Sequence, residues 1–252
     1  MNRHEAPATA LISGATEGIG QASAWALAEA GHDVAVTDLD PASLAETMRG
    51  IAARGRRAVA LALDLRAEAS IAAALRDAEA ALGPLGVLVN NAGCTLGRAA
   101  TDVTWAEWDQ VMDVNLKGSY FLATGFARRC VAANQAGAVI SVASTHGLTG
   151  IPDRSVYGIS KGGIVQMTRM LAIEWAALGI RVNAVAPGTV LTPSRARMLA
   201  DPARRQRMLD RIPTGRFPTA AEIAGAIAYL ASPIAASVTG QILPIDGGLT
   251  AY

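Results

Sequence analysis

A glycine-rich segment between an apolar run and a helix-like stretch restricts the possible folds more than any other feature of this sequence. Residues 8–13 are mostly apolar, Gly14, Gly18 and Gly20 follow with Gly-x-x-x-Gly-x-Gly spacing, and residues 21–30 are helix-like. This order predicts a strand, a tight turn and a helix. Glycines let the backbone approach a pyrophosphate, and the N–H groups at the helix start would meet its charge. A turn that only needs positive φ is the alternative interpretation.

The next strand-like run, residues 33–37, ends in an acid. Asp38 lies eighteen residues beyond Gly20, near the spacing of an acid that binds an adenosine ribose. Its carboxylate would accept hydrogen bonds from the ribose hydroxyls and repel a 2′-phosphate. Glu17 is acidic, Leu39 is apolar, and no Lys or Arg stands between positions 3 and 49. The sequence therefore predicts NAD rather than NADP, with a solvated strand end or helix cap as the alternative role of Asp38.

A tyrosine and a lysine four residues apart indicate acid–base chemistry. Tyr157 and Lys161 are one helical turn apart, so both side chains share a face. A phenol has a reference pKa of about 10, and a neighbouring cation favours its ionised form. Ser144 follows the strand-like run 138–142 and offers a hydrogen-bond donor to a reacting oxygen. Taken singly, each of these residues has an ordinary structural interpretation.

Together these motifs resemble the short-chain dehydrogenase/reductase family from about Ala8 to Gly248. Further matches are Asn90-Asn91-Ala92-Gly93 after the strand-like run 87–89, and Asp246-Gly247-Gly248 near the end. The resemblance implies a catalytic set of Asn115, Ser144, Tyr157 and Lys161. It implies cofactor contacts by Gly14, Thr16, Glu17, Gly18, Ile19, Gly20, Asp38, Leu39, Asp64, Leu65, Asn91, Ala92, Gly93, Tyr157, Lys161, Pro187, Gly188, Val190 and Thr192.

The resemblance also implies how these residues act. The substrate oxygen is expected between Ser144 and Tyr157, and Tyr157 exchanges its proton while a hydride passes to or from NAD. Lys161 is expected to bind the nicotinamide ribose as well. Asn115 is expected to steady its helix and a proton-relaying water. Asp64 is expected beside the adenine.

Length and composition favour one α/β domain. With 252 residues, 51% of them apolar, the chain fills one sizeable core, and no linker-like segment divides it. We expect a single Rossmann-like domain over residues 1–252, a doubly wound parallel sheet with helices on both faces, and a substrate lid at about 191–216. No run of eighteen apolar residues occurs, which argues against a membrane span and favours a cytoplasmic protein.

Cysteine, histidine and charge point to no metal or nucleic acid. Cys94 and Cys130 lack Cys-x-x-Cys spacing, and the histidines form no cluster, so reduced thiols are expected. Cys94 either lines the substrate site or is a small buried residue. A net charge of +1 gives no reason to invoke nucleic acid. A group of arginines either solvates the lid or attracts an anionic substrate: Arg195, Arg197, Arg204, Arg205, Arg207, Arg211 and Arg216.

The substrate is less determined. Thr95, Thr145 and His146 are placed to hydrogen-bond extra hydroxyls. Leu96, Ile151 and Met198 are placed to cover a carbon skeleton. This mixture suggests a polyol, sugar or cyclic secondary alcohol, and the region 144–188 resembles sugar and polyol dehydrogenases of the family. Alternatives are a 3-oxoacyl thioester reductase, a non-catalytic dinucleotide-binding module, and a methyltransferase that lacks a use for Tyr157 and Lys161.

The resemblance implies a homotetramer built partly from helices at about 117–133 and 157–178. One stripe at helical spacing gives support: Ile164, Met167, Leu171, Trp175 and Leu178. Gly162 and Gly163 would permit close approach of another helix. The same stripe is also compatible with packing inside one subunit.

Overall fold

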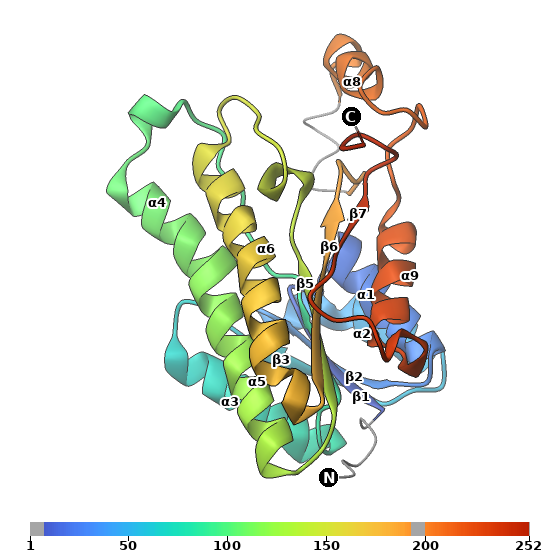
Figure 1. The fold of residues 1–252 in the computed structure, drawn as a ribbon. Helices are drawn as coiled ribbons and strands as arrows, with labels where there is room; N and C mark the ends of the chain where they lie inside the picture. The colour runs from blue at the N-terminus through green and yellow to red at the C-terminus, as the bar shows by residue number, and fades with distance from the viewer. Residues whose placement is uncertain (1–7, 193–199, 252) are drawn as a thin grey trace.

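A parallel β-sheet organises the molecule. The computed structural model describes residues 8–192 and 200–251. Within them, seven parallel strands have the order β3-β2-β1-β4-β5-β6-β7 (Figure 1). The strands are β1 (Thr9–Ser13), β2 (Asp33–Asp38), β3 (Ala58–Ala62), β4 (Val87–Asn90), β5 (Gly137–Val142), β6 (Ile180–Pro187) and β7 (Ile242–Ile245). The predicted doubly wound sheet is confirmed.

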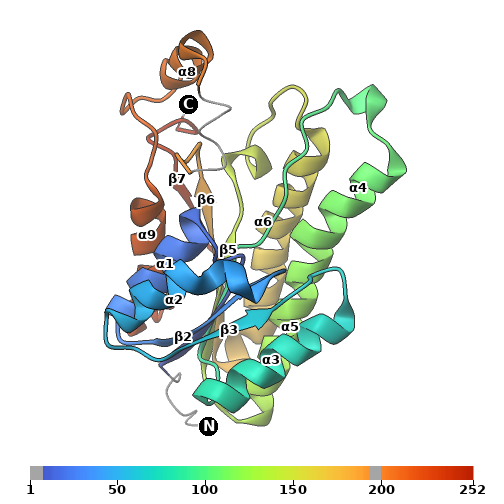
Figure 2. The same ribbon diagram turned by 180° about the vertical axis from the view of Figure 1, so that it is seen from behind.

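Helices cover both faces of this sheet, as Figures 1 and 2 show from opposite sides. One face carries α1 (Gly18–Glu29), α2 (Ala45–Ala52) and α9 (Ala220–Ala231). The other carries α3 (Glu68–Leu82), α5 (Ser119–Ala132) and α6 (Ser155–Trp175), with α4 (Trp105–Met112) leading into α5. Because both faces are covered, every residue of β1, β4 and β5 is buried, which explains their continuous apolar runs.

Short helical turns connect these elements. They are η1 (Pro41–Leu44), η2 (Ala100–Asp102), η4 (Thr145–Gly147), η5 (Ala176–Leu178) and η6 (Pro233–Ala235). Helix α8 (Pro202–Leu209) stands apart from the two layers, beyond the carboxyl ends of β6 and β7 (Figure 1). Among the described residues, no helix is both long and apolar enough to cross a membrane.

A π-helical segment, η3 (Asp113–Gly118), joins α4 to α5. Asn115 was expected on a helix, but the sequence analysis predicted neither the π-helical form of this segment nor the bounds of α4 before it. Gly118 packs against the loop that follows β3, since a Cβ at this position would lie 2.4 Å from the carbonyl oxygen of Leu65. Such widened turns are frequent at functional sites, and η3 contains Asn115.

The apolar stripe of α6 packs within the subunit. Ile164, Met167, Leu171 and Trp175 are buried in the core between α6 and the sheet, and Leu178 packs against the same core. Gly163 admits the Leu116 side chain, because a Cβ there would approach Leu116 Cδ2 to 2.6 Å. The alternative that kept this stripe inside one subunit is therefore the correct one, and the stripe gives no support to an oligomer.

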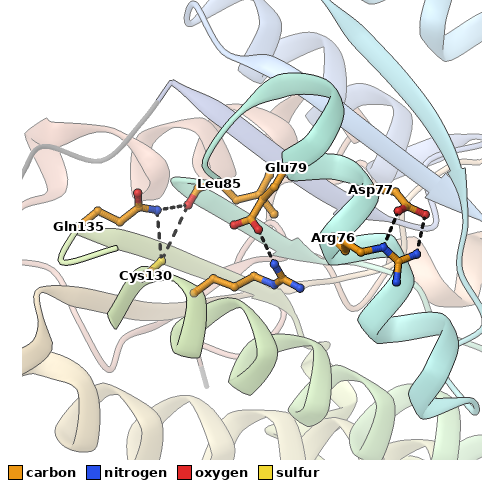
Figure 3. Close-up of polar contacts among 7 residues, drawn as sticks. Arg76, Asp77, Glu79, Leu85, Cys130 and Gln135 are labelled. Carbon is orange, nitrogen blue, oxygen red and sulfur yellow. Dashed lines mark hydrogen bonds and ion pairs between the residues drawn. The ribbon is translucent and has the colours of Figure 1, made fainter. Parts of the chain in front are cut away.

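Polar contacts connect α3 and α5 near the loop before β4 (Figure 3). Gln135 donates a hydrogen bond of 2.8 Å to the Leu85 carbonyl, and the Cys130 thiol lies 3.8 Å from the same oxygen. Arg129 on α5 pairs with Glu79 on α3. Cys130 is therefore a buried thiol of the core, at the point where α5 meets the loop before β4.

Candidate active site

A cleft of about 500 Å³ lies at the carboxyl ends of the strands. Loops that follow β1, β2, β3, β4, β5 and β6 all contribute to it, because parallel strands bring the same ends to one edge of the sheet. Its lining includes many residues predicted as cofactor contacts: Gly14, Glu17, Gly18, Ile19, Asp38, Leu39, Asp64, Leu65, Asn91, Ala92, Gly93, Tyr157, Lys161, Pro187, Gly188, Val190 and Thr192. Thr16 and Gly20, also predicted, do not line it.

The glycine-rich loop needs its glycines for close packing. Gly14 and Gly18 have φ of +69° and +62°. A Cβ on Gly14 would lie 2.8 Å from Ala92 Cα, and one on Gly20 would lie 2.1 Å from the Gly14 carbonyl oxygen. Gly20 therefore shapes the loop from behind and does not face the cleft.

The start of α1 is open toward this cleft. Glu17 occupies the N-cap position without a side-chain hydrogen bond to the helix, whereas Thr104 and Thr219 cap α4 and α9 through their hydroxyls. The first N–H groups of a helix need acceptors, and an uncapped helix start bordered by glycines is suited to a phosphate. The cleft thus fits the pyrophosphate of a dinucleotide.

Asp38 is held in place at the end of β2. Its carboxylate accepts a hydrogen bond of 2.7 Å from the Thr16 hydroxyl and one of 2.8 Å from the Leu39 N–H. Thr16 therefore orients Asp38 and does not itself face the cleft. A carboxylate fixed at the wall of the cleft is suited to accept hydrogen bonds from ribose hydroxyls.

Asp64 has a partner that sequence reasoning missed. Arg66 donates through Nε (3.0 Å) and Nη2 (2.7 Å) to the Asp64 carboxylate, and these bonds hold the pKa of that carboxyl below its usual range. Arg66 also lines the cleft. Its position directly after Asp64-Leu65 was the available signal. The other lining residues that were missed are Leu63, Gln110, Val114, Val142 and Ala143.

The structure brings Ser144, Tyr157 and Lys161 together at one end of the cleft. All three line it and are buried, with exposed fractions of 8%, 7% and 5%. Lys161 Nζ lies 5.9 Å from the centre of the Tyr157 ring and donates a hydrogen bond of 2.6 Å to the Val142 carbonyl. The Ser144 hydroxyl oxygen accepts a hydrogen bond of 3.2 Å from the His146 N–H. This bond does not use the hydroxyl proton of Ser144, which is therefore available for donation to another group.

Asn115 does not line the cleft but connects its walls. Its side-chain oxygen accepts from the Cys94 N–H (2.8 Å), and its amide donates to the Cys94 carbonyl (2.9 Å) and to the Ser160 hydroxyl (3.0 Å). Ser160 in turn donates to the Tyr157 carbonyl at 2.7 Å. The buried amide therefore fixes the loop after β4 and the first turn of α6 relative to each other.

Cys94 lines the cleft and is only half-buried, so it is not the small buried residue of one interpretation, and its place at the substrate stays a prediction. Burial raises the pKa of its thiol, and the nearby Lys161 charge partly opposes this shift. The thiol is accordingly a neutral group at neutral pH. The described residues bring no three His, Cys, Asp or Glu side chains into an arrangement for a metal ion.

The predicted substrate residues do not all line the same cavity. Thr95 lines the main cleft, whereas Thr145, His146 and Ile151 line a smaller cavity beside it. Leu96 lines neither, and its carbonyl accepts a hydrogen bond of 3.1 Å from Arg154. Met198 lies outside the described residues, as do Arg195 and Arg197.

The arginines that are described have different surroundings. Arg216 pairs with Glu222 at 2.6 Å, and the Arg205 guanidinium lies 6.0 Å from the centre of the Phe217 ring. Arg211 lines the smaller cavity together with Thr145 and His146. Only part of the arginine group is therefore a solvated surface.

The sequence matches known proteins along nearly its whole length. A family model described as enoyl-(acyl carrier protein) reductase matches residues 14–250. The chain is 42% identical to inactive 2-(S)-hydroxypropyl-CoM dehydrogenase 2 of Xanthobacter autotrophicus, over 90% of this chain and 99% of that protein. It is 41% identical to a galactitol 2-dehydrogenase of Cereibacter sphaeroides, over 97% and 96% of the two chains. It is 40% identical to cis-4-hydroxycyclohexanecarboxylate dehydrogenase of Sinomonas cyclohexanicum, over all of both chains.

Solved structures agree over nearly the whole length. A protein of Sinorhizobium meliloti, provisionally described as a short-chain alcohol dehydrogenase, superposes with a TM-score of 0.94 at 46% identity, covering 96% of each chain. A protein of Agrobacterium tumefaciens, provisionally described as a 2-deoxy-D-gluconate 3-dehydrogenase and holding NADP, superposes with a TM-score of 0.91 at 38% identity, covering 97% and 96% of the two chains.

Proposed function

The chain belongs to the short-chain dehydrogenase/reductase family, and from that premise we propose that it is an NAD-dependent enzyme that interconverts a secondary alcohol and a ketone. The observation that carries the proposal is the buried grouping of Ser144, Tyr157 and Lys161 at one end of a dinucleotide-sized cleft. A polyol, a sugar or sugar acid, and a cyclic alcohol are the substrate classes that the pocket residues and the relatives support.

The chain's own residues have distinct tasks in this proposal. The Ser144 hydroxyl donates to the substrate oxygen, and Tyr157 removes the hydroxyl proton in oxidation or returns it in reduction. Lys161 holds its ammonium 5.9 Å from the centre of the Tyr157 ring, so a positive charge lies beside the group that exchanges the proton. Asn115 positions the first turn of α6 through Ser160. A bound nicotinamide would accept or supply the hydride.

NAD is preferred over NADP in this proposal because of the charge beside the ribose. Asp38 is held toward the cleft by Thr16, and Glu17 and Leu39 border it. Among the residues that line the cleft, Arg66 is the positively charged one nearest to Asp38 in the sequence. Its guanidinium already donates two hydrogen bonds to Asp64. A 2′-phosphate would therefore meet a fixed carboxylate without a matched cation. The NADP-bound relative makes a direct test necessary.

Substitution of the phenol tests the proposal. Tyr157→Phe removes one oxygen from a buried side chain and should lower kcat by about 1,000-fold or more, since acid–base catalysis and orientation of the oxygen are lost together. NADH formation from a panel of polyols, sugars and cyclic alcohols measures turnover, and NADH fluorescence titration measures cofactor binding. Binding should persist in the variant. A variant that keeps most of its kcat would refute the role of Tyr157.

Two other functions remain as alternatives. A 3-oxoacyl thioester reductase would share all these residues, and reduction of acetoacetyl thioesters with NADH or NADPH but no activity on the alcohol panel would favour it. The second alternative is a non-catalytic dinucleotide-binding protein, and one relative of this chain is named as inactive. This alternative predicts NADH binding without turnover of the alcohols or of the thioesters. The buried pairing of Tyr157 with Lys161 argues for the enzyme, since binding alone needs no such pair.

The proposal includes the organisation of the whole protein. Residues 1–252 are proposed to form one domain with a substrate lid at about 191–216, and the enzyme is proposed to be a cytoplasmic homotetramer. Support for the location comes from Cys94 and Cys130, which form no disulfide. Support for the oligomer comes from exposed apolar side chains on the outer face of α5 and α6: Tyr120, Phe121, Ile159, Met170 and Ile173.

A further inference from the structure

Side chains occupy the carbonyl oxygens of the glycine-rich loop. Four successive carbonyls, those of residues 13–16, accept hydrogen bonds from side chains of other segments or of α1. Asn91 donates to the Ser13 and Gly14 carbonyls, at 3.0 and 2.7 Å. Because carbonyl oxygens repel a pyrophosphate and N–H groups attract it, a loop that binds one needs other partners for its carbonyls.

Thr47 of α2 supplies the donor for the third of these carbonyls. Its hydroxyl donates to the Ala15 carbonyl at 2.7 Å, and both residues are 0% exposed. Gln21 of α1 donates to the Thr16 carbonyl at 3.2 Å and to the Thr47 hydroxyl oxygen at 3.1 Å. Neither Thr47 nor Gln21 is among the described residues that line the cleft. The two side chains can therefore act on a bound cofactor only through the loop that they hold.

The packing of α2 on α1 fixes the position of Thr47. The Trp25 indole N–H donates to the Thr47 carbonyl at 3.2 Å. The Trp25 ring lies against Gly50, where a Cβ would come within 2.0 Å of the indole nitrogen. Trp25 thus anchors α2 at the residue whose hydroxyl reaches the loop, so the bond to Ala15 belongs to the core and not to a solvated surface.

The Ala15 carbonyl also sets the direction of the next N–H group. In a planar trans peptide the N–H of Thr16 points opposite to the carbonyl of Ala15, so a carbonyl held toward α2 keeps this N–H directed away from α2. The Thr16 side chain in turn donates to the Asp38 carboxylate at 2.7 Å. Without the Thr47 hydroxyl the buried carbonyl loses a donor, and an unmatched buried carbonyl favours rotation of its peptide.

We propose that Thr47 is a positioning residue of the cofactor site: its hydroxyl holds the Ala15 carbonyl toward α2 and so keeps the glycine-rich loop in the shape that receives the pyrophosphate of a dinucleotide. This inference rests on the proposed function and extends the cofactor site to a residue of α2 behind the loop. Gln21 has the same task at the Thr16 carbonyl, and the hydrogen bond between Gln21 and Thr47 couples the two donors.

Titration with NADH tests the hydroxyl. Thr47→Val keeps the shape of the side chain and removes the donor, so the Kd for NADH, measured by fluorescence, should rise about 10-fold, the size of one buried hydrogen bond. Thr47→Ser keeps the donor and should keep nearly the wild-type Kd. An unchanged Kd in Thr47→Val, or a Thr47→Ser variant as weak as Thr47→Val, would overturn the inference.

Thr168→Val is the matched control. Thr168 of α6 is also 0% exposed, and its hydroxyl donates to the Ile164 carbonyl at 2.8 Å. Thr168 is not among the described residues that line the cleft. The free energy of unfolding should fall in both valine variants, whereas the Kd for NADH should rise only in Thr47→Val. Equal increases in Kd would show that a general loss of core stability, and not the loop, weakens binding.

Steady-state kinetics separates positioning from catalysis. Thr47→Val should raise KM for NAD, while kcat at saturating NAD and KM for the alcohol stay near their wild-type values, because Ser144, Tyr157 and Lys161 lie on other elements. A fall in kcat as large as the rise in KM would place the damage at the catalytic end of the cleft and contradict the inference.

ADP-ribose separates this inference from the proposed function. It carries the pyrophosphate and the adenosine ribose but no nicotinamide, so its affinity, measured by calorimetry, does not depend on turnover. Binding that weakens about 10-fold in Thr47→Val supports the inference even if no alcohol reacts. Turnover of an alcohol, with equal ADP-ribose affinity in wild type and variant, would leave the proposed function in place and refute the role of Thr47. A wild-type protein that binds neither ADP-ribose nor NADH would refute both.

Gln21→Met is the second variant if Thr47→Val does not fold. Gln21 is only half-buried, and its substitution removes the donor to the Thr16 carbonyl and one partner of the Thr47 hydroxyl. The Kd for ADP-ribose should rise in this variant while the free energy of unfolding changes little. A wild-type Kd in Gln21→Met would show that the loop keeps its shape without these donors.

Discussion

At the scale of single residues, the side chains of the candidate site act through their neighbours. Asp38 owes its position to Thr16, and the first turn of α6 owes its position to Asn115 and Ser160. The bond between Thr16 and Asp38 is partly buried, and those of Asn115 and Ser160 are buried, where an unmatched polar group is costly. The function of the site therefore depends on these positioning residues as well as on the residues proposed to contact the cofactor or substrate.

The first prediction concerns the cofactor. Asp38→Ser combined with Leu39→Arg replaces a fixed carboxylate with a cation at the ribose end of the cleft. The ratio of kcat/KM for NADP to that for NAD should rise on the order of 100-fold, because repulsion of the 2′-phosphate becomes attraction. Leu39→Ala is the control, since it changes the same surface without adding charge. A wild-type enzyme that uses both cofactors equally would contradict the reasoning.

At the scale of elements, the N-terminal ends of the helices differ in how their backbone N–H groups are satisfied. Helices α4 and α9 begin with complete capping boxes, at Thr104 with Glu107 and at Thr219 with Glu222. The start of α1 has no side-chain cap and faces the cleft. A capped end satisfies its own N–H groups, whereas an uncapped one keeps them for a ligand.

A second prediction concerns the cap of α9. Hydrogen bonds from Arg216, and then from Thr219, lower the pKa of Glu222 from 4.5 to about 2. Because the folded state holds the proton more weakly than the unfolded state, this contribution to stability is complete above pH 4.5 and disappears as the pH falls toward 2. Glu222→Gln keeps the cap geometry but removes the charge.

The difference in unfolding free energy between wild type and Glu222→Gln should therefore be present at pH 7 and shrink progressively below pH 4.5, as measured by urea unfolding across pH. Glu46→Gln on α2 is the matched control, because its carboxylate makes no ion pair or hydrogen bond with the described residues. A difference that stays constant with pH would show that the Arg216 pair does not shift the carboxyl in solution.

At the scale of the whole molecule, apolar surface remains after the core is complete. Ile159 and Met170 are each 50% exposed and Ile173 is 80% exposed, and their helical spacing puts all three on one side of α6. Contiguous apolar surface on a folded subunit marks contact with another molecule. These side chains, and not the buried stripe of the same helix, are the ones that an oligomer of this protein would bury.

Sedimentation velocity provides the test at this scale. The wild-type protein should sediment as a tetramer at micromolar concentration. Ile173→Glu places a charge in the expected contact and should shift the population toward smaller species. Ala53→Glu adds the same charge to the exposed end of α2 on the opposite face of the sheet and should leave the tetramer intact. A monomeric wild-type protein would end the oligomer proposal.

The sequence by itself determined the fold class, a parallel sheet with helices on both faces, and the positions of the main motifs along the chain. Apolar runs, the glycine-rich turn and the acid at the end of β2 are local signals, because each depends on residues that are adjacent in the chain. The same holds for Tyr157 and Lys161, which are one helical turn apart. The carboxyl ends of parallel strands then had to meet at one edge, so the place of the site followed from the fold class.

Tertiary structure decided the contacts between distant segments. Spacing did not reveal the π-helical segment around Asn115, the inward direction of the α6 stripe, or the hydrogen bonds from Thr16 to Asp38. The cavity that joins His146 to Arg211 arises from loops some sixty-five positions apart. Whether an apolar stripe faces its own sheet or a partner, and whether an arginine faces water or a cavity, depends on packing that no local pattern encodes.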